Sequence, residues 1–229
     1  YWGYQVIGQF QSEEEIRNYP INLDGNNNRT LLPGDFIYKD VNGDGIINSM
    51  DERPIGYPEG WAPIMSFGGN IGLAWKGIDL NIDLSGGAMQ GWRQNYELAN
   101  AYHGNGNSPV YLLEDRWHRA DLYDPESEWI PGRYPAIRKG EFSYNNKNSD
   151  FWLHNVRYLR IKNLEVGYSL PAQLLRPIRA QKVRVYANVS NLCSFDNVGK
   201  FGVDPEITAA AAVVYPQQRT FLLGFNITY

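Results

Sequence analysis

The sequence predicts an all-β chain whose strands belong to an antiparallel transmembrane β-barrel with long extracellular loops. First, the last stretch, 219–229, alternates strictly between apolar and polar residues, which is typical of a strand with one apolar face. Second, 78–84 alternates in the same way with Asp79, Asn81 and Asp83 on one face, which is costly in a packed core but favourable in a water-filled lumen. Third, the predicted connections are long on one side of the sheet and short on the other, as in outer-membrane barrels.

Composition restricts the alternatives. The chain has 229 residues, a formal net charge of −4 and a mean hydropathy of −0.47, so it lacks the basic footprint of a nucleic-acid-binding protein. We find no run of 18 apolar residues, and therefore expect no transmembrane helix. A search for long apolar runs does not detect barrel strands, because these strands are only about 9–11 residues long and half polar. A single cysteine, Cys193, excludes an internal disulfide framework and a four-cysteine zinc site.

Six strands are predicted along the chain. They cover 1–10, 67–75, 78–84, 151–170, 182–191 and 219–229. In the fourth strand, Arg157, Arg160 and Lys162 interrupt the alternation, which predicts either a projection beyond the membrane or a β-bulge.

The connections fall into two classes if Tyr229 lies in the periplasm. The long ones, 11–61, 92–150 and 193–218, would all be extracellular, and the short turns, 76–77 and 171–181, would be periplasmic. A soluble sandwich has no reason to sort its loops in this way. A structureless loop as long as 92–150 is also unusual in a compact soluble domain.

The sharpest local motif is DVNGDGIINSMD at 40–51, which matches the calcium-loop template of short oxygen-bearing side chains at alternate positions. Gly45 permits the sharp turn, and Asn48 would act through water. The expected calcium ligands are Asp40, Asn42, Asp44, the carbonyl of Ile46, and Asp51. We expect a structural Ca²⁺ that holds an extracellular loop; the alternative is an Asn-Gly and Asp-Gly turn without metal.

Aromatic residues are frequent in the long loops. Those expected to stack on sugar rings or to contact a partner are Trp92, Tyr96, Tyr102, Trp117 and Trp129. The alternative is that they pack the loops together. His103, His118 and His154 share no spacing that suggests a metal site or a catalytic triad.

Several sequence blocks, taken in order, resemble the SusC/RagA family of TonB-linked (TonB-dependent) outer-membrane transporters. The blocks are GDFIYKDVNGDGIINSMDERPIG (34–56), WKGIDLNIDLSGG (75–87), LRIKNLEVGYSLP (159–171), VRVYANVSNL (183–192), GVDPEI (202–207) and YPQQRTFLLGFNITY (215–229). The resemblance implies a barrel of about 22 strands with an N-terminal plug. It also implies a SusD-like surface lipoprotein as a lid, and import of glycans or peptides across the outer membrane of a Gram-negative bacterium with energy from the TonB complex.

The sequence departs from this family in extent, since no plug, no TonB box and no first half of the barrel are recognised. Residues 1–229 are therefore expected to be the C-terminal part of the barrel. Six strands in an open sheet leave two bare edges and a lipid-facing stripe. We therefore expect the remainder of the barrel and outer-membrane lipid as partners, and no independent folding.

The sequence leaves two alternative functions to compare with import. A secreted, calcium-stabilised carbohydrate-binding β-sandwich would use the same loop and the same aromatic residues. A glycoside hydrolase needs two carboxylates facing each other across a cleft. Asp79 and Asp83 share one strand face, and nothing in the sequence places a partner opposite them. We therefore expect no enzymatic activity, while the substrate and the oligomeric state stay open.

Overall fold

The computed structural model describes residues 1–60, 62–138, 142–206 and 217–229, which form two compact units. We call residues 62–90, 156–206 and 217–229 the sheet unit, and residues 1–60, 91–138 and 142–155 the loop unit. Within the described residues, no helix is both long enough and apolar enough to cross a membrane.

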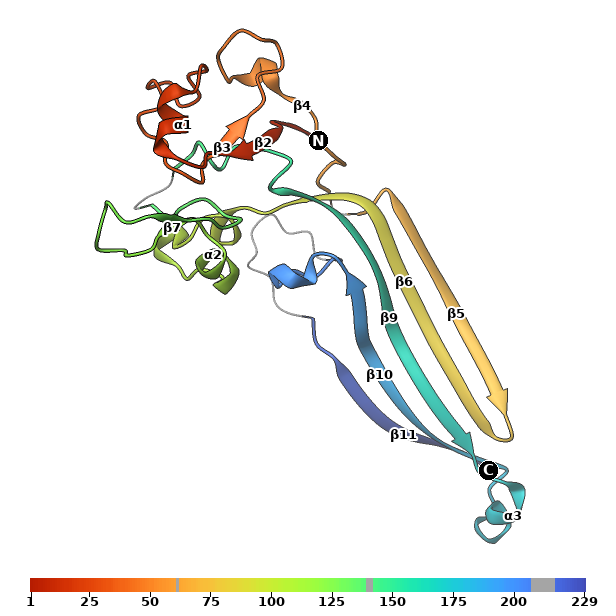
Figure 1. The fold of residues 1–229 in the computed structure, drawn as a ribbon. Coiled ribbons are helices and arrows are strands. Elements are labelled where there is room, and N and C mark those ends of the chain that lie inside the picture. The colour runs from red at the N-terminus through yellow and green to blue at the C-terminus, as the bar shows by residue number, and fades with distance from the viewer. Residues whose placement is uncertain (61, 139–141, 207–216) are drawn as a thin grey trace. The chain divides into compact units, whose positions relative to one another are not determined.

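A five-stranded sheet with the order β11-β10-β9-β6-β5 dominates the sheet unit (Figure 1). Its strands are β5 (Met65–Trp75), β6 (Ile78–Arg93), β9 (Leu153–Ser169), β10 (Lys182–Asp196) and β11 (Thr220–Thr228). The pairs β5–β6, β9–β10 and β10–β11 are antiparallel. This arrangement is the predicted meander of up-and-down strands.

Both short connections lie at the end of the sheet that also holds the C-terminus (Figure 1). Lys76 and Gly77 join β5 to β6 with φ values of 47° and 85°, the two positive angles of a type I′ hairpin turn. Residues 170–181 join β9 to β10 and contain α3 (Ala172–Leu175) and η4 (Arg176–Ile178). The predicted sorting of short turns to one end is therefore confirmed.

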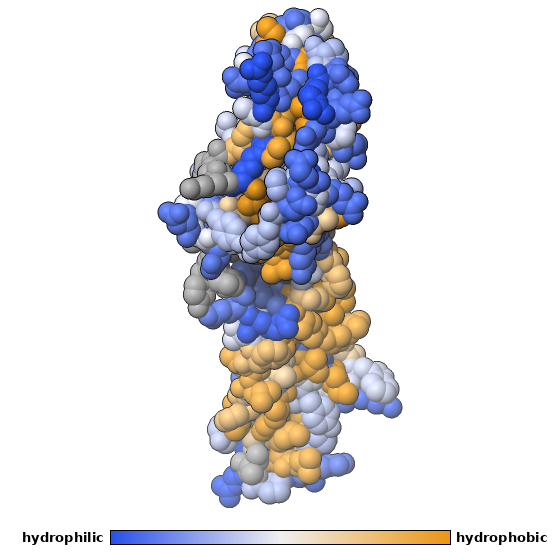
Figure 2. Space-filling model, turned by 60° about the vertical axis from the view of Figure 1, so that its left-hand side comes forward, coloured by the Kyte–Doolittle hydropathy of each residue, from blue (hydrophilic) through white to orange (hydrophobic). Residues whose placement is uncertain are grey.

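One face of the sheet is apolar and exposed, and Figure 2 shows these side chains as a broad hydrophobic patch. Cross-strand neighbours share this face; for example, Val185 pairs with Phe225, and the two are 49% and 69% exposed. Other members are Phe67, Ile71, Leu73, Trp75, Ile78, Val166, Tyr168, Phe221, Leu223 and Ile227. A continuous apolar surface of this kind is the lipid-facing side of a barrel wall.

The opposite face is polar and carries paired charges. Arg184 Nε donates to Asp79 Oδ1 at 3.0 Å, and Arg184 Nη2 donates to Glu165 Oε1 at 2.7 Å. The guanidinium covers Gly167, where an added Cβ would lie 2.3 Å from Arg184 Nη2. Asn70 Nδ2 donates to Asp83 Oδ1 at 2.7 Å on the same face. The acids that a packed core would disfavour are thus solvated or paired.

A register shift between Ser190 and Cys193, opposite Asn163 and Ile161, shows an irregularity beside the interrupted stretch of β9. Asn191 adopts a φ of 53° there, so the extra residue lies on β10 and not on the interrupted strand itself. The alternation of exposed apolar residues along β9 also changes near this register shift. After the shift the exposed apolar residues are the even-numbered Val166 and Tyr168, whereas before it the exposed one is the odd-numbered Leu159.

The strand count differs from the prediction. Residues 1–10 do not join the main sheet but form β1 (Trp2–Gly3) and β2 (Val6–Gln9), which pair with β4 (Arg53–Pro54) and β3 (Phe36–Tyr38). Five of the six predicted strands therefore build the sheet. The first was misplaced because aromatic alternation also suits a short strand that packs on a core.

The loop unit is folded around a buried aromatic cluster and is not a set of structureless loops. Phe10, Phe36, Tyr38 and Trp152 are at most 2% exposed and belong to one core. The helix α1 (Glu13–Asn18) begins at Ser12, whose side chain accepts a hydrogen bond from the backbone N–H of Glu15 at 3.1 Å. The remaining elements of this unit are η1 (Ser49–Asp51), η2 (Tyr96–Leu98), η3 (His103–Asn105), α2 (Val110–Glu114), β7 (His118–Arg119) and β8 (Trp129–Ile130).

Candidate functional site

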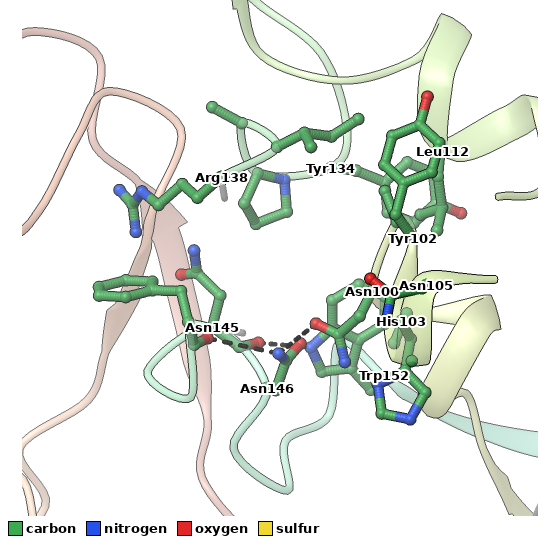
Figure 3. A pocket seen from close by; sticks show the side chains of 17 residues that line it. Asn100, Tyr102, His103, Asn105, Leu112, Tyr134, Arg138, Asn145, Asn146 and Trp152 are labelled. Carbon is green, nitrogen blue, oxygen red and sulfur yellow. Dashed lines mark hydrogen bonds between the residues drawn. The ribbon is translucent and has the colours of Figure 1, made fainter. Parts of the chain in front are cut away.

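A cavity of about 450 Å³ opens in the loop unit between the η2–η3 segment and residues 134–138 (Figure 3). This volume falls in the range of small-molecule sites. Its described lining comprises residues 99–105, Leu112, residues 134–138, Phe142, Asn145, Asn146 and Trp152.

Buried aromatic rings form one side of the cavity. Tyr134 and Trp152 stack with ring centroids 6.0 Å apart and an interplanar angle of 24°. The indole Nε1 of Trp152 donates to the carbonyl of Asn145 at 2.7 Å, which fixes the ring. Asn146 Nδ2 donates to Asn100 Oδ1 and to the carbonyl of Phe142. The cavity therefore combines rigid rings with carboxamide groups.

The positive charge of Arg138 at the cavity is neutralised by a buried carboxylate of the core. Arg138 forms an ion pair with Asp35, whose side chain is fully buried and also accepts a hydrogen bond from Asn145 Nδ2 at 2.7 Å. Burial raises the pKa of Asp35, although the Arg138 charge and the hydrogen bonds act in the opposite direction. Because Arg138 is paired, it does not present an uncompensated charge to a ligand.

Two of the five predicted contact aromatics are buried. Trp92 is 4% exposed and stacks on His154 at 5.4 Å, and Trp117 is 3% exposed. Trp117 lies against Gly34, where a Cβ would come within 2.2 Å of the indole. Both rings thus pack the loop unit and offer little surface to a ligand.

The other three predicted aromatics are accessible to different degrees. Tyr96 and Tyr102 are 45% and 57% exposed, and Tyr102 lines the cavity. Trp129 is half-buried beneath the Arg119 guanidinium, which lies 4.4 Å from the ring centroid. Tyr96 and Trp129 are not among the residues that line the cavity, and contact of the three side chains with substrate or partner stays a prediction.

The predicted calcium loop adopts a tight conformation held by its own carboxylates. Asp40 accepts hydrogen bonds from the backbone N–H groups of Gly43 and Gly45 at 2.7 and 2.8 Å. Asn42 Nδ2 donates to Asp44 Oδ2 at 2.8 Å. Gly45 has a φ of 79°, so the sharp turn predicted there is confirmed.

Asp51 closes this loop as a capping residue. Its fully buried carboxylate accepts hydrogen bonds from Val41 N at 2.8 Å and from Asn48 N at 3.0 Å, and Asn48 in turn caps η1. Burial opposes ionisation, but the backbone N–H groups of Asn48, Val41 and Asn42 outweigh it and hold the pKa of Asp51 below its usual range.

The donor types of this loop suit a hard cation, because carboxylate, carboxamide and carbonyl oxygens are the ligands that Ca²⁺ prefers. Asp40, Asn42, Asp44, Asp51 and the Ile46 carbonyl supply those oxygens. Within the described ranges, however, no three or more His, Cys, Asp or Glu side chains are grouped so as to hold a metal ion. The calcium site therefore stays a prediction.

A second cluster, which was not predicted from the sequence, lies on the polar face of the sheet. Arg160 is 4% exposed and pairs with Asp204 and Glu206, and Lys162 also pairs with Glu206. The signal was present, because these two cations interrupt the alternation of their strand. Asp79 also has a partner that was not anticipated, Arg184, which makes it unlike a free catalytic carboxylate.

Comparison with known proteins finds no matching family model. The chain is 26% identical to TonB-dependent receptor P3 of Formosa agariphila over 245 residues, covering 100% of the chain and 22% of that protein. It is 34% identical over 99 residues to TonB-dependent receptor SusC of Bacteroides thetaiotaomicron, covering 41% of the chain and 9% of SusC. The chain thus spans less than a quarter of the length of the curated relatives it matches.

Solved structures agree on the fold. The RagAB peptide importer in its open-open state matches with a TM-score of 0.59 and 19% identity over 100% of the chain and 22% of that structure. A second structure, of the RagAB peptide transporter, matches with a TM-score of 0.56 and 21% identity over 85% of the chain and 21% of that structure. The resemblance to SusC/RagA-type TonB-dependent transporters and the barrel fold predicted from the sequence are therefore confirmed. The curated relatives are named as receptors, and none of those compared is named as an enzyme.

Proposed function

We propose that this chain is the C-terminal barrel portion of a SusC/RagA-like importer in the outer membrane of a Gram-negative bacterium. The observation that carries the proposal is the two-faced sheet, which has exposed apolar residues on one side and ion-paired polar residues on the other. Similarity over the whole chain to TonB-dependent receptors supports it. A secreted β-sandwich would have to cover that apolar face with a second sheet.

Import would require the rest of the barrel, a plug and the TonB complex, which the plug-bearing part would engage. A SusD-like lipoprotein would capture glycan or peptide substrate above the barrel. The loop unit, with its cavity and the exposed rings of Tyr96 and Tyr102, offers surface for either role. This chain itself would supply part of the wall and no catalysis.

The test is to isolate the native complex from outer membranes in detergent and identify its components by mass spectrometry. We expect peptides of a plug and of a surface lipoprotein to copurify with this chain, and membrane extraction to depend on detergent. A soluble 26.2 kDa species without either companion would contradict the proposal and favour the carbohydrate-binding domain.

Residues 40–51 are proposed as the structural calcium loop of this importer. The order of oxygen donors and the positive φ of Gly45 support a site built from Asp40, Asn42, Asp44, Asp51 and the Ile46 carbonyl. Asp44→Ala in the full-length protein should remove a single bound calcium, measured by elemental analysis after dialysis. Asp24→Ala, which removes an acid from another turn of the loop unit, should retain it. Equal metal content in wild type and Asp44→Ala would exclude the site.

A further inference from the structure

The segment 197–206, which we call the strap, leaves the end of β10 and brings Asp204 and Glu206 onto the polar face of the sheet. Glu206 Oε1 accepts a hydrogen bond from Ser85 Oγ on β6 at 3.1 Å, and Glu206 Oε2 pairs with Lys162 Nζ on β9 at 2.6 Å. Ser85 alternates in phase with Asp79 and Asp83, so it belongs to the polar face. The strap therefore reaches two adjacent strands, β6 and β9, on the polar face of the wall.

Arg160 anchors the strap. Its Nη2 lies 2.6 Å from Asp204 Oδ2, and its Nη1 lies 2.9 Å from both Glu206 Oε2 and Gln217 Oε1. The Arg160 side chain is only 5% exposed. Charge-assisted bonds from one buried guanidinium to three acceptors are strong and geometrically specific. Removing the guanidinium would take the Arg160 charge from Asp204 and would leave Glu206 paired with Lys162 alone of these two cations.

Apolar packing holds the strap as well. Val198, Phe201 and Val203 are 0%, 7% and 8% exposed. Asp196 Oδ1 accepts a hydrogen bond from Val198 N at 3.0 Å, and η5 (Gly199–Phe201) ends at Gly202, whose φ is 74°. The strap thus has its own buried side chains, a local cap and a network of ion pairs. These features are typical of a fixed element and not of a mobile flap.

We propose that the strap is a constriction built into the lumen wall, and that Arg160 is the residue that positions it. This inference rests on the proposed function, because it assigns to the strap the limit on the cross-section of cargo passing through the barrel. Bulky or branched cargo would be excluded at the strap, and slender cargo would pass beside it. Lys200, which is exposed, would lie along that passage.

The position of the strap is tested by thiol labelling of the full-length transporter in intact cells. With Cys193→Ser as background, Lys200→Cys should react with a small biotin maleimide but not with a polyethylene glycol maleimide of several kilodaltons. Tyr123→Cys, at a loop residue that is 97% exposed, should react with both reagents. Rapid labelling of Lys200→Cys by the large reagent, at the rate of Tyr123→Cys, would overturn the proposal.

The role of Arg160 is tested in the same assay. Adding Arg160→Ala should raise the labelling rate of Lys200→Cys by the large reagent at least tenfold. Arg184→Ala is the matched control, because Arg184 also holds two acids on the polar face but none of its ion-pair partners belongs to the strap. It should leave that rate unchanged. An equal increase in both variants, or none with Arg160→Ala, would contradict the assignment.

Two further measurements keep the test decisive. If Arg160→Ala does not reach the membrane, Glu206→Gln, which keeps the side-chain size and removes one charge, should give a severalfold increase; no increase would overturn the proposal. Labelling is independent of transport, so a transporter that imports nothing but still shields Lys200→Cys would contradict the proposed import and support the strap.

Discussion

The two units of this chain differ in where their large apolar side chains lie. In the loop unit, Phe36, Tyr38 and Trp152 are buried together in an aromatic core. In the sheet unit, apolar side chains such as Leu223 and Phe225 are 83% and 69% exposed, while Arg160 is buried among acids. One polypeptide therefore has a part that suits water and a part that suits lipid. The same substitution should have different consequences in each unit.

The largest effect is expected in the aromatic core of the loop unit. Trp152→Ala removes a ring that stacks on Tyr134 and packs against Phe36, which should lower the free energy of unfolding by about 3–5 kcal/mol. Chemical denaturation of the full-length protein, followed by protease sensitivity of this unit, measures the loss. The control is Tyr123→Ala at a 97% exposed position, which should change little; equal protease sensitivity of the two variants would contradict the core assignment.

The next effect distinguishes the two faces of β11. Leu223→Arg places a charge on the lipid-facing side and should cost about 2–4 kcal/mol in a bilayer if the site lies near its midplane. Leu222→Arg, one residue away on the polar face, should cost far less. Folding yields of the full-length protein in lipid vesicles provide the measurement. Equal yields for the two variants would show that neither face contacts lipid.

A smaller effect is expected from backbone strain in the loop unit. Gly34→Ala adds a Cβ 2.2 Å from the Trp117 indole at a φ of 92°, and should cost more than the roughly 1–3 kcal/mol of positive-φ strain alone. Gly25→Ala has a similar φ of 77° but no atom within 4 Å of its Cβ, so it isolates the strain. The difference between the two variants in thermal unfolding measures the crowding. No difference would mean that Trp117 moves freely.

The smallest effect concerns pH. The pKa of Asp51 is lowered in the folded protein from the ordinary 3.8. Its ionised form therefore contributes stability that is fully present above pH 3.8 and is lost as pH falls through the folded-state pKa. Unfolding of the loop unit should become easier on acidification below pH 3.8, and Asp51→Asn should weaken that dependence. A pH profile unchanged by Asp51→Asn would exclude this contribution.

The sheet could be predicted from the sequence because alternation of apolar and polar residues is the direct signature of a strand with one face toward lipid and the other toward water. This pattern alone predicts the strands at 78–84 and 219–229, and their predicted faces agree with the structure. The prediction fails where alternation, or a break in it, has a cause other than the two faces of a barrel strand. Residues 1–10 alternate because they pack on an aromatic core, and Arg160 and Lys162 break the alternation because the strap places acids beside them.

The candidate site was less accessible to sequence reasoning. Residue type alone points to Tyr102, but the cavity that it lines depends on residues 134–138 and Asn145, which are remote in sequence. Trp92, near the end of β6, and Trp117 are buried, unlike Tyr96 and Tyr102, and the burial of a single residue has no periodic signature in the sequence. The ion pair of Arg138 with Asp35 joins two segments that no motif links.

The tight turn at Lys76 and Gly77 also has a consequence for the time course of folding. Because it joins β5 directly to β6, this hairpin depends only on local contacts and belongs to the class that forms in about 1–10 μs. Pairing of β6 with β9 instead requires closure of the long excursion between Arg93 and Leu153. The entropic cost of closure grows with the length of flexible chain, so prior folding of this excursion would shorten the effective loop and speed the pairing. The aromatic core of the loop unit would then act as a kinetic aid to assembly of the wall.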